Sequence, residues 1–352
     1  GSNQNRTPTP LVNPSPPPTP SDFYPPMPGE FLLIGLGLAH PSDISVRALK
    51  HLRTSCGLSA LPGAPDEGTL KPNAKVYLEC YTSIFPHFSI DEVSKELGVP
   101  VLEADRTIVE QQPEDLFFTP VLEDDATVAL LIVGDPFSAT THSDLTSRAA
   151  ELGVPMTVYH NASIMNAVGA TGLQLYRFGQ TVSIPFFNDK WRPHSFATKI
   201  RANVDADLHT MCLLDIKVKE QTDENLLRGR AIFEPPRFMS IATAARQLLE
   251  SLRVLGKGEV GYDEQTTVVA VARIGSTDQL IASMSLAAAA GFDAGTPLHT
   301  LLLCGSLHVM EEEAVSRIRL SPEEEKACLE RGERAGDVGT SDAENTEEED
   351  EM

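Results

Sequence analysis

The chain has 352 residues, 41% of them hydrophobic and 22% charged, which is enough for two globular lobes that each bury a core. Its 28 Lys and Arg against 50 Asp and Glu residues give a net charge of −22, which disfavours nucleic acid as a partner because phosphates would repel the chain. Five cysteines without CxxC spacing, and no apolar run of about 18 residues, argue against a disulfide framework, a zinc site and a membrane span, and fit a cytoplasmic protein.

The first half of the chain predicts a disordered tail followed by an α/β lobe. Residues 1–30 form the tail, because they hold ten of the 26 prolines. Residues 31–165 alternate apolar runs with helical patterns, which predicts an N-terminal lobe on a parallel sheet. Its clearest strands are 31–34 and 126–133, since continuous apolar runs are typical of strands covered on both faces. Residues 55–73, rich in Gly, Pro and Ser, are expected to be a surface insertion.

The second half predicts another α/β lobe and an acidic tail. Residues 166–310 form the C-terminal lobe, with strands at 181–187, 209–216 and 267–273 and helices at 193–202, 223–229 and 240–252. Residues 311–352 carry 16 acidic and 5 basic side chains, so we expect them to be largely disordered, with a possible helix over 311–329.

Polar groups follow the apolar strands of the first lobe. Asp135 lies directly after the most apolar strand, and the run Thr-Thr-His-Ser-Asp at 140–144 adds hydroxyl, imidazole and carboxylate groups just beyond it. Ligands of open parallel sheets bind outside the carboxyl ends of the strands. The segment HNASIMN at 160–166 mixes small, apolar and amide groups, which suits a flat heterocycle. A helix cap explains each of these segments as well.

Several familiar catalytic signatures are missing from the sequence. Gly35 and Gly37 begin a dinucleotide fingerprint, but its third glycine position holds His40. There is no GxSxG, HExxH, GxxxxGKS or metal-spaced cluster, so we expect no metal centre and no hydrolytic machinery.

Five segments of the chain resemble the diphthine methyl ester synthase family. They are LIGLGL at 33–38, YLECYTS at 77–83, GDPFSATTHSD at 134–144, HNASIMNAVG at 160–169 and CLLDIKVKE at 212–220. The resemblance runs from about residue 31 to about residue 310, except for the insertion. It implies a two-lobed α/β tetrapyrrole-methylase fold, with a parallel-sheet N-terminal lobe and a mixed-sheet C-terminal lobe.

The resemblance also implies an activity. The family binds S-adenosyl-L-methionine between its lobes, releases S-adenosyl-L-homocysteine and acts as a homodimer on elongation factor 2, whose target histidine carries a 3-amino-3-carboxypropyl group. The eukaryotic type, which this chain resembles more closely, trimethylates the amine and esterifies the carboxylate. No nucleic acid or membrane partner is implied.

Carried over by position, the cofactor contacts of the family fall on Leu38, Asp135, Ser138, Ser163, Ile164, Leu214, Ile274 and His299. Ser138 departs from the family, which often has glycine there. His142 and Asp144 are our candidates for accepting the proton of the amine, directly or through water. Deprotonation by solvent before docking would need neither of them.

Two other functions remain open at this point. One is a methylase of the same fold that acts on a tetrapyrrole or on a ribose of RNA, although the acidity of the chain disfavours RNA. The other is an inactive protein that binds the cofactor without turnover.

Overall fold

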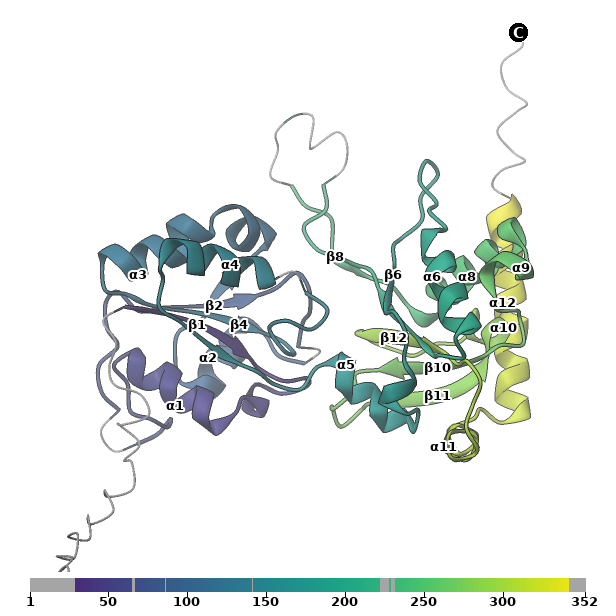
Figure 1. The fold of residues 1–352 in the computed structure, drawn as a ribbon, viewed down its shortest axis with the longest axis horizontal. Coiled ribbons are helices and arrows are strands. Elements are labelled where there is room, and N and C mark those ends of the chain that lie inside the picture. Colours follow the sequence, from purple (N-terminus) through teal and green to yellow (C-terminus); the bar gives the residue numbers. More distant parts are fainter. Residues whose placement is uncertain are drawn as a thin grey trace, which may run out of the picture.

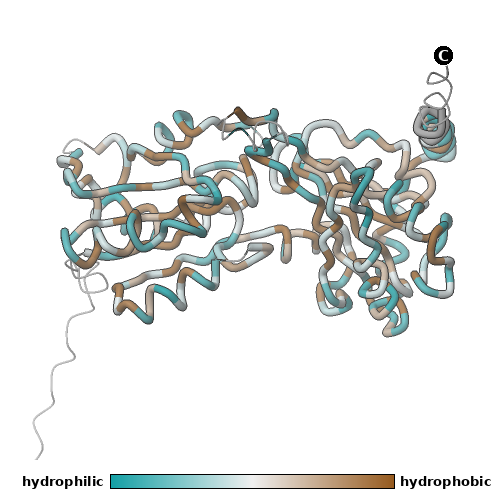
Figure 2. The backbone as a smooth tube through the Cα atoms, turned by 90° about the horizontal axis from the view of Figure 1, so that it is seen from above, coloured by the Kyte–Doolittle hydropathy of each residue, from teal (hydrophilic) through white to brown (hydrophobic). Residues whose placement is uncertain are grey.

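The computed structural model describes residues 29–341 except 65–66, 86, 141, 222–227 and 229–231. The helix predicted at 223–229 therefore falls almost entirely outside the described residues, and so does Thr141. Figure 1 shows two lobes side by side, and the view from above in Figure 2 shows them joined by few chain crossings. The C-terminal helix lies on the outer side of the second lobe.

The first lobe is built on a five-stranded parallel sheet of order β3-β2-β4-β1-β5. Its strands are β1 (Glu30–Gly35), β2 (Lys75–Glu79), β3 (Leu102–Ala104), β4 (Thr127–Ile132) and β5 (Met156–Tyr159). All six residues of β1 and of β4 are buried, as the continuous apolar runs of the sequence predict.

Helices cover the two faces of this sheet (Figure 1). The helical elements of the lobe are η2 (Pro41–Asp43), α1 (Val46–Ser55), α2 (Ile90–Leu97), η3 (Thr107–Gln111), η4 (Glu114–Phe118), α3 (Thr119–Glu123) and α4 (Ser143–Leu152). Leu32 and Ile34 of β1 pack on the side of α1 and α2, whereas Phe31 and Leu33 pack on the side of α3 and α4. Successive β1 side chains thus enter two different cores, because side chains alternate along a strand.

The second lobe has a five-stranded mixed sheet of order β11-β10-β12-β7-β6, in which only β6 and β7 are parallel. The mixed sheet confirms the prediction for this lobe. Its strands are β6 (Val182–Ile184), β7 (Thr210–Leu214), β10 (Thr267–Ala272), β11 (Leu280–Ser285) and β12 (His299–Leu303). A short ribbon of β8 (Ile216–Lys217) and β9 (Arg237–Phe238) extends from the lobe.

Short helical turns connect the lobes, and longer helices pack on the second sheet. The turns are α5 (Ile164–Ala167), η5 (Val168–Thr171) and η6 (Leu175–Arg177), and the helices are α6 (Ser195–Asp205), α8 (Ile241–Leu255), α9 (Lys257–Val260) and α10 (Leu286–Ala289). None of the helices in the described part of the chain combines the length and the hydrophobicity that a membrane crossing requires.

The C-terminal segment differs from the prediction. Where we expected a largely disordered tail from residue 311, the structure has α11 (Val309–Arg317) and α12 (Pro322–Ser341). Cys328 of α12 is 2% exposed and packs in the core of the second lobe. Glu325 accepts a hydrogen bond of 2.9 Å from the Ser285 amide. These contacts hold a charged helix on the lobe, which the count of acidic residues alone does not reveal.

Candidate functional site

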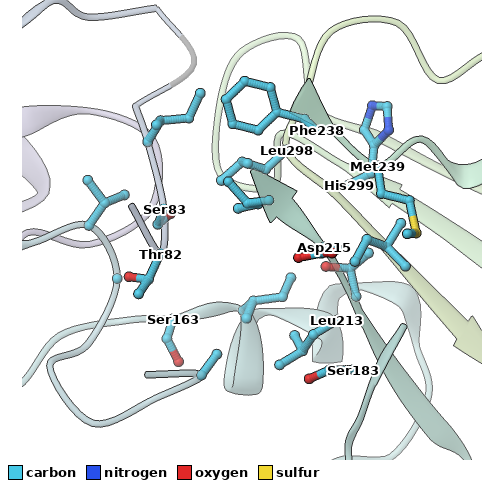
Figure 3. A pocket seen from close by; sticks show the side chains of 18 of the residues that line it. Thr82, Ser83, Ser163, Ser183, Leu213, Asp215, Phe238, Met239, Leu298 and His299 are labelled. Atoms are coloured by element: carbon cyan, nitrogen blue, oxygen red, sulfur yellow. The ribbon is translucent and has the colours of Figure 1, made fainter. Parts of the chain in front are cut away.

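A cavity of about 370 Å³ lies between the two lobes and is walled by both of them (Figure 3). The first lobe contributes the segments that follow β1, β2, β3 and β4, together with the start of α5. The second lobe contributes the ends of β6 and β7, the β8–β9 ribbon, and the segments around β10 and β12. The cavity is thus outside the carboxyl ends of the parallel strands, where the sequence places the ligand.

Two glycines join the ends of β1 and β4 at the floor of the site. Gly37 and Gly134 exchange backbone hydrogen bonds of 3.2 and 2.6 Å. Both have positive φ angles, +82° and +98°, which a residue with a side chain rarely adopts. Gly35 cannot carry a side chain either, because its Cβ would lie 2.7 Å from the Gly134 carbonyl oxygen. The glycine turn therefore serves the joining of two strands that end at the cavity.

Seven of the eight predicted cofactor contacts line the cavity. They are Leu38, Ser138, Ser163, Ile164, Leu214, Ile274 and His299. Three belong to the second lobe and lie about 50 to 135 residues beyond the others along the chain, so only the fold brings the set together. The Ser138 hydroxyl donates to the Asp135 carboxylate at 3.4 Å, and it therefore lies at the wall as a polar group held from behind.

Asp135, the eighth residue, lies behind the wall of the cavity. Its carboxylate accepts hydrogen bonds from the amides of Phe137 (2.9 Å) and Asn161 (3.1 Å) and from His160 Nδ1 (2.9 Å). Burial raises the pKa of Asp135, but these donors outweigh burial and the net pKa is lowered. Asp135 thus ties the loops after β4 and β5 together, which shapes the cavity without entering it.

His299 presents an unsatisfied polar atom at the cavity. Its Nε2 donates to the Thr296 carbonyl at 3.0 Å, and its Nδ1 is buried without a hydrogen-bond partner among the described residues. Burial lowers the pKa of His299, so the ring is neutral at pH 7 and Nδ1 is an acceptor. Buried acceptors are rarely left unpaired in proteins, so this atom suits a hydrogen-bond donor of a ligand.

The two candidates for proton transfer lie outside this cavity. His142 and Asp144 line a separate hollow with Val109, Glu110 and Leu145. The His142 ring is buried between the Pro136 carbonyl (3.3 Å) and the Tyr81 hydroxyl (3.5 Å). Burial lowers the pKa of His142 to about 4, and the Asp144 carboxylate is exposed and pairs with Arg148 at 3.4 Å. The structure therefore does not bring these two residues to the predicted cofactor contacts.

Other lining residues were not among the predicted contacts. Thr82 and Ser83 follow β2, Arg106 follows β3 and Asp215 follows β7, and all four line the cavity. In Figure 3, Thr82 and Ser83 lie across the cavity from Asp215. Their position directly after a strand was the available signal, but a single polar residue after a strand is common in any sheet.

Comparisons with known proteins agree with this geometry. The family model of tetrapyrrole (corrin/porphyrin) methylases matches residues 30–290. The diphthine methyl ester synthase of Yarrowia lipolytica is 46% identical over 318 residues, which are 90% of this chain and 95% of the relative. That of Homo sapiens is 46% identical over 288 residues, which are 81% of this chain and 93% of the relative. The chain belongs to the diphthine methyl ester synthase family.

A solved structure supports the same assignment. A crystal structure of diphthine synthase is 29% identical, has a TM-score of 0.63, and covers 86% of this chain and 98% of its own. The two-lobed tetrapyrrole-methylase fold is thereby confirmed. As a member of the diphthine methyl ester synthase family, the chain is a methyltransferase of diphthamide biosynthesis, and its substrate is a protein.

Proposed function

We propose that the chain transfers methyl groups from S-adenosyl-L-methionine to elongation factor 2. The acceptor is the histidine that carries a 3-amino-3-carboxypropyl group, and the products are a trimethylated amine, a methyl ester and S-adenosyl-L-homocysteine. The observation that carries this proposal is the inter-lobe cavity, whose wall contains seven of the eight residues that the family resemblance assigns to the cofactor.

The chemistry of the cavity wall suits an adenosyl sulfonium. Leu38, Ile164, Leu214 and Ile274 provide apolar surface for a heterocycle. Ser138 and Ser163 provide hydroxyl groups, and His299 Nδ1 provides an acceptor that lacks a protein donor. The volume of about 370 Å³ is within the range of about 300 to 1,000 Å³ typical of small-molecule sites.

The reaction needs positioning more than covalent help from the protein. When bound, the donor supplies an activated methyl group that an amine or a carboxylate attacks directly. The residues of the wall hold the two reactants in line, and well-oriented reactants gain on the order of 7 to 11 kcal/mol. In ester formation a carboxylate and a cation lose their charges, so the apolar side chains of Leu38, Ile164, Leu214 and Ile274 favour the transition state over the ion pair.

The amine loses a proton before each of its methylations. His142 and Asp144 were proposed as acceptors, but neither lines the cavity. We therefore favour the other route, in which the amine loses its proton to solvent before it docks. Mutation of both residues with normal methyl transfer at neutral pH is the result that this route predicts.

The proposal includes assembly and location. A homodimer follows from the family resemblance, and a cytoplasmic location follows from the substrate, since elongation factors work on cytoplasmic ribosomes. The five cysteines are all free, which suits a reducing compartment.

One experiment separates this function from the alternatives. The full chain is mixed with methyl-labelled S-adenosylmethionine and elongation factor 2 that carries the aminocarboxypropyl intermediate, and the modified peptide is analysed by mass spectrometry. Three labelled methyl groups on the amine and one on the carboxylate are expected. Label that appears only on RNA or on a porphyrin, or binding of the donor without transfer to the factor, would contradict the proposal.

A further inference from the structure

The charged side chains of the cavity differ in how far the protein already satisfies them. Among the described lining residues, Arg106, Arg273 and Asp215 are the Arg, Lys, Asp and Glu side chains. Arg273 is 8% exposed and donates to Asp278 and to the carbonyls of Ala294 and Thr296. Its donors are thus largely occupied by the loops that it holds together, which leaves Arg106 and Asp215 as the groups available to a ligand.

Arg106 is a cation held at the wall of the first lobe. Its guanidinium lies 5.1 Å from the centre of the Tyr81 ring, which also lines the cavity. The one carboxylate near it is Glu110 at 3.6 Å, one helical turn away, and both side chains are well exposed. Such a pair contributes at most about 1 kcal/mol, so it competes weakly with a ligand carboxylate.

Asp215 is an anion held at the wall of the second lobe. Its Oδ2 accepts a hydrogen bond from the Phe186 amide at 3.0 Å and lies 3.5 Å from Lys217 Nζ. Its Oδ1 has no hydrogen-bond partner among the described residues. The Phe186 amide fixes the direction of the carboxylate, which lies toward the cavity in Figure 3.

We propose that Arg106 and Asp215 bind the two charged ends of the methyl-accepting group. Arg106 binds the carboxylate, and Asp215 binds the amine. This inference rests on the proposed function, because a substrate with both an amine and a carboxylate is the ligand that needs a cation on one lobe and an anion on the other. The two lobes then have to be in place together for the substrate to be gripped at both ends.

The arrangement has a consequence for the order of events at the site. Arg106 attracts the carboxylate only while it is charged. Once the carboxylate becomes a methyl ester, the contact loses its ionic part, and charged hydrogen bonds are about twice as strong as neutral ones. Esterification therefore weakens the grip of the first lobe and favours release of the finished product.

The test separates binding of the substrate from binding of the cofactor. Arg106→Gln and Asp215→Asn are each compared with a control of the same charge change at an exposed site, Lys95→Gln and Glu259→Gln. For every variant, KM for the aminocarboxypropyl-modified factor and Kd for S-adenosyl-L-homocysteine are measured. We expect KM to rise about tenfold or more in the two cavity variants, because a charged hydrogen bond is lost, with Kd changed less than about twofold.

A second substrate sharpens the assignment of Arg106. A modified factor or peptide whose attached chain lacks the carboxylate should lose the difference between wild type and Arg106→Gln, while Asp215→Asn stays impaired. Unchanged KM in both variants, or a rise in Kd for S-adenosylhomocysteine as large as the rise in KM, would overturn the inference. These outcomes leave the wild-type reaction intact, whereas failure of wild-type transfer would overturn the proposed function itself.

Discussion

Lys219 Nζ lies 2.9 Å from the Asp105 carboxylate, across the boundary between the two lobes. Lys219 follows β8 of the second lobe, and Asp105 follows β3 of the first; Glu103 of β3 is a second partner at 3.0 Å. Val218 packs against the core of the first lobe beside them. The base of the β8–β9 ribbon is thus fixed to the first lobe, next to the cavity that Ile216 lines.

Lys219→Ala should loosen this contact without unfolding the protein. A partly exposed ion pair contributes up to about 1 kcal/mol, so the melting temperature should change little. The same energy is lost from the arrangement that closes the cavity, which should raise Kd for S-adenosylhomocysteine about fivefold. Lys190→Ala, an exposed lysine of the second lobe, is the control. Equal affinity in both variants would show that the ion pair has no role at the cavity.

Glu79 should determine the shape of the wall after β2. Its buried Oε1 accepts hydrogen bonds of 2.6 Å from the amides of Tyr81 and Thr82, and its Oε2 accepts one of 2.5 Å from the Thr82 hydroxyl. Glu79→Ala leaves these donors unpaired, and each costs about 1 to 3 kcal/mol if buried. Glu79→Gln keeps a carbonyl oxygen for the two amides. In urea unfolding we expect Ala to be clearly the less stable variant, and equal stability would contradict this role.

His142 should make the protein sensitive to acid. Burial lowers its pKa from about 6.5 to about 4 in the folded state. Below pH 6.5 the unfolded chain takes up a proton that the folded chain refuses, so stability falls as pH falls toward 4. The loss between pH 7.5 and pH 5 is about 2 kcal/mol for these values.

His142→Gln removes this titration and keeps a donor for the Pro136 carbonyl. Urea unfolding at pH 7.5 and pH 5 should therefore show a smaller loss of stability in the variant than in wild type. The same loss in both proteins would mean that His142 is protonated as readily in the folded chain as in the unfolded one.

Glu311 should be essential for docking of α11 on the second lobe. It is fully buried, and it contacts His209 Nε2 at 3.1 Å and Arg177 Nη1 at 3.0 Å. Removing one partner of a buried charged pair costs about 3 to 5 kcal/mol. Glu311→Ala should lose about that much free energy of unfolding, whereas Glu312→Ala, its exposed neighbour on the same helix, should lose little. A similar small loss in both variants would contradict the account.

Apolar patterns predicted the fold better where strands are buried on both faces. β1 and β4 are continuous runs of large apolar residues, so their position and burial follow from the sequence. β11 and α10 share one stretch rich in alanine and serine, in which neither period dominates, and β12 is a short strand that no turn signal marks. These elements are defined by pairing with β10, which is a tertiary contact.

The site could be predicted only in part for a related reason. Segments that resemble the family identify Leu38 and Ile164 of one lobe and Leu214 of the other as members of one site. His142 follows the same loop as Ser138, but the beginning of α4 directs its ring toward Tyr81 and Pro136. Sequence proximity therefore does not decide which side of a loop a side chain faces.

Calorimetric titration of the full chain with S-adenosyl-L-homocysteine tests most directly whether the inter-lobe cavity holds the methyl donor. Leu214→Arg places a charge in the cavity wall, and Leu255→Arg places the same charge at an exposed position of the same lobe. We predict saturable binding to wild type and to Leu255→Arg, with binding to Leu214→Arg weakened by about a hundredfold or lost because a charge would be buried without a partner. Absence of binding to well-folded wild type, or equal affinity in the two variants, would contradict the account.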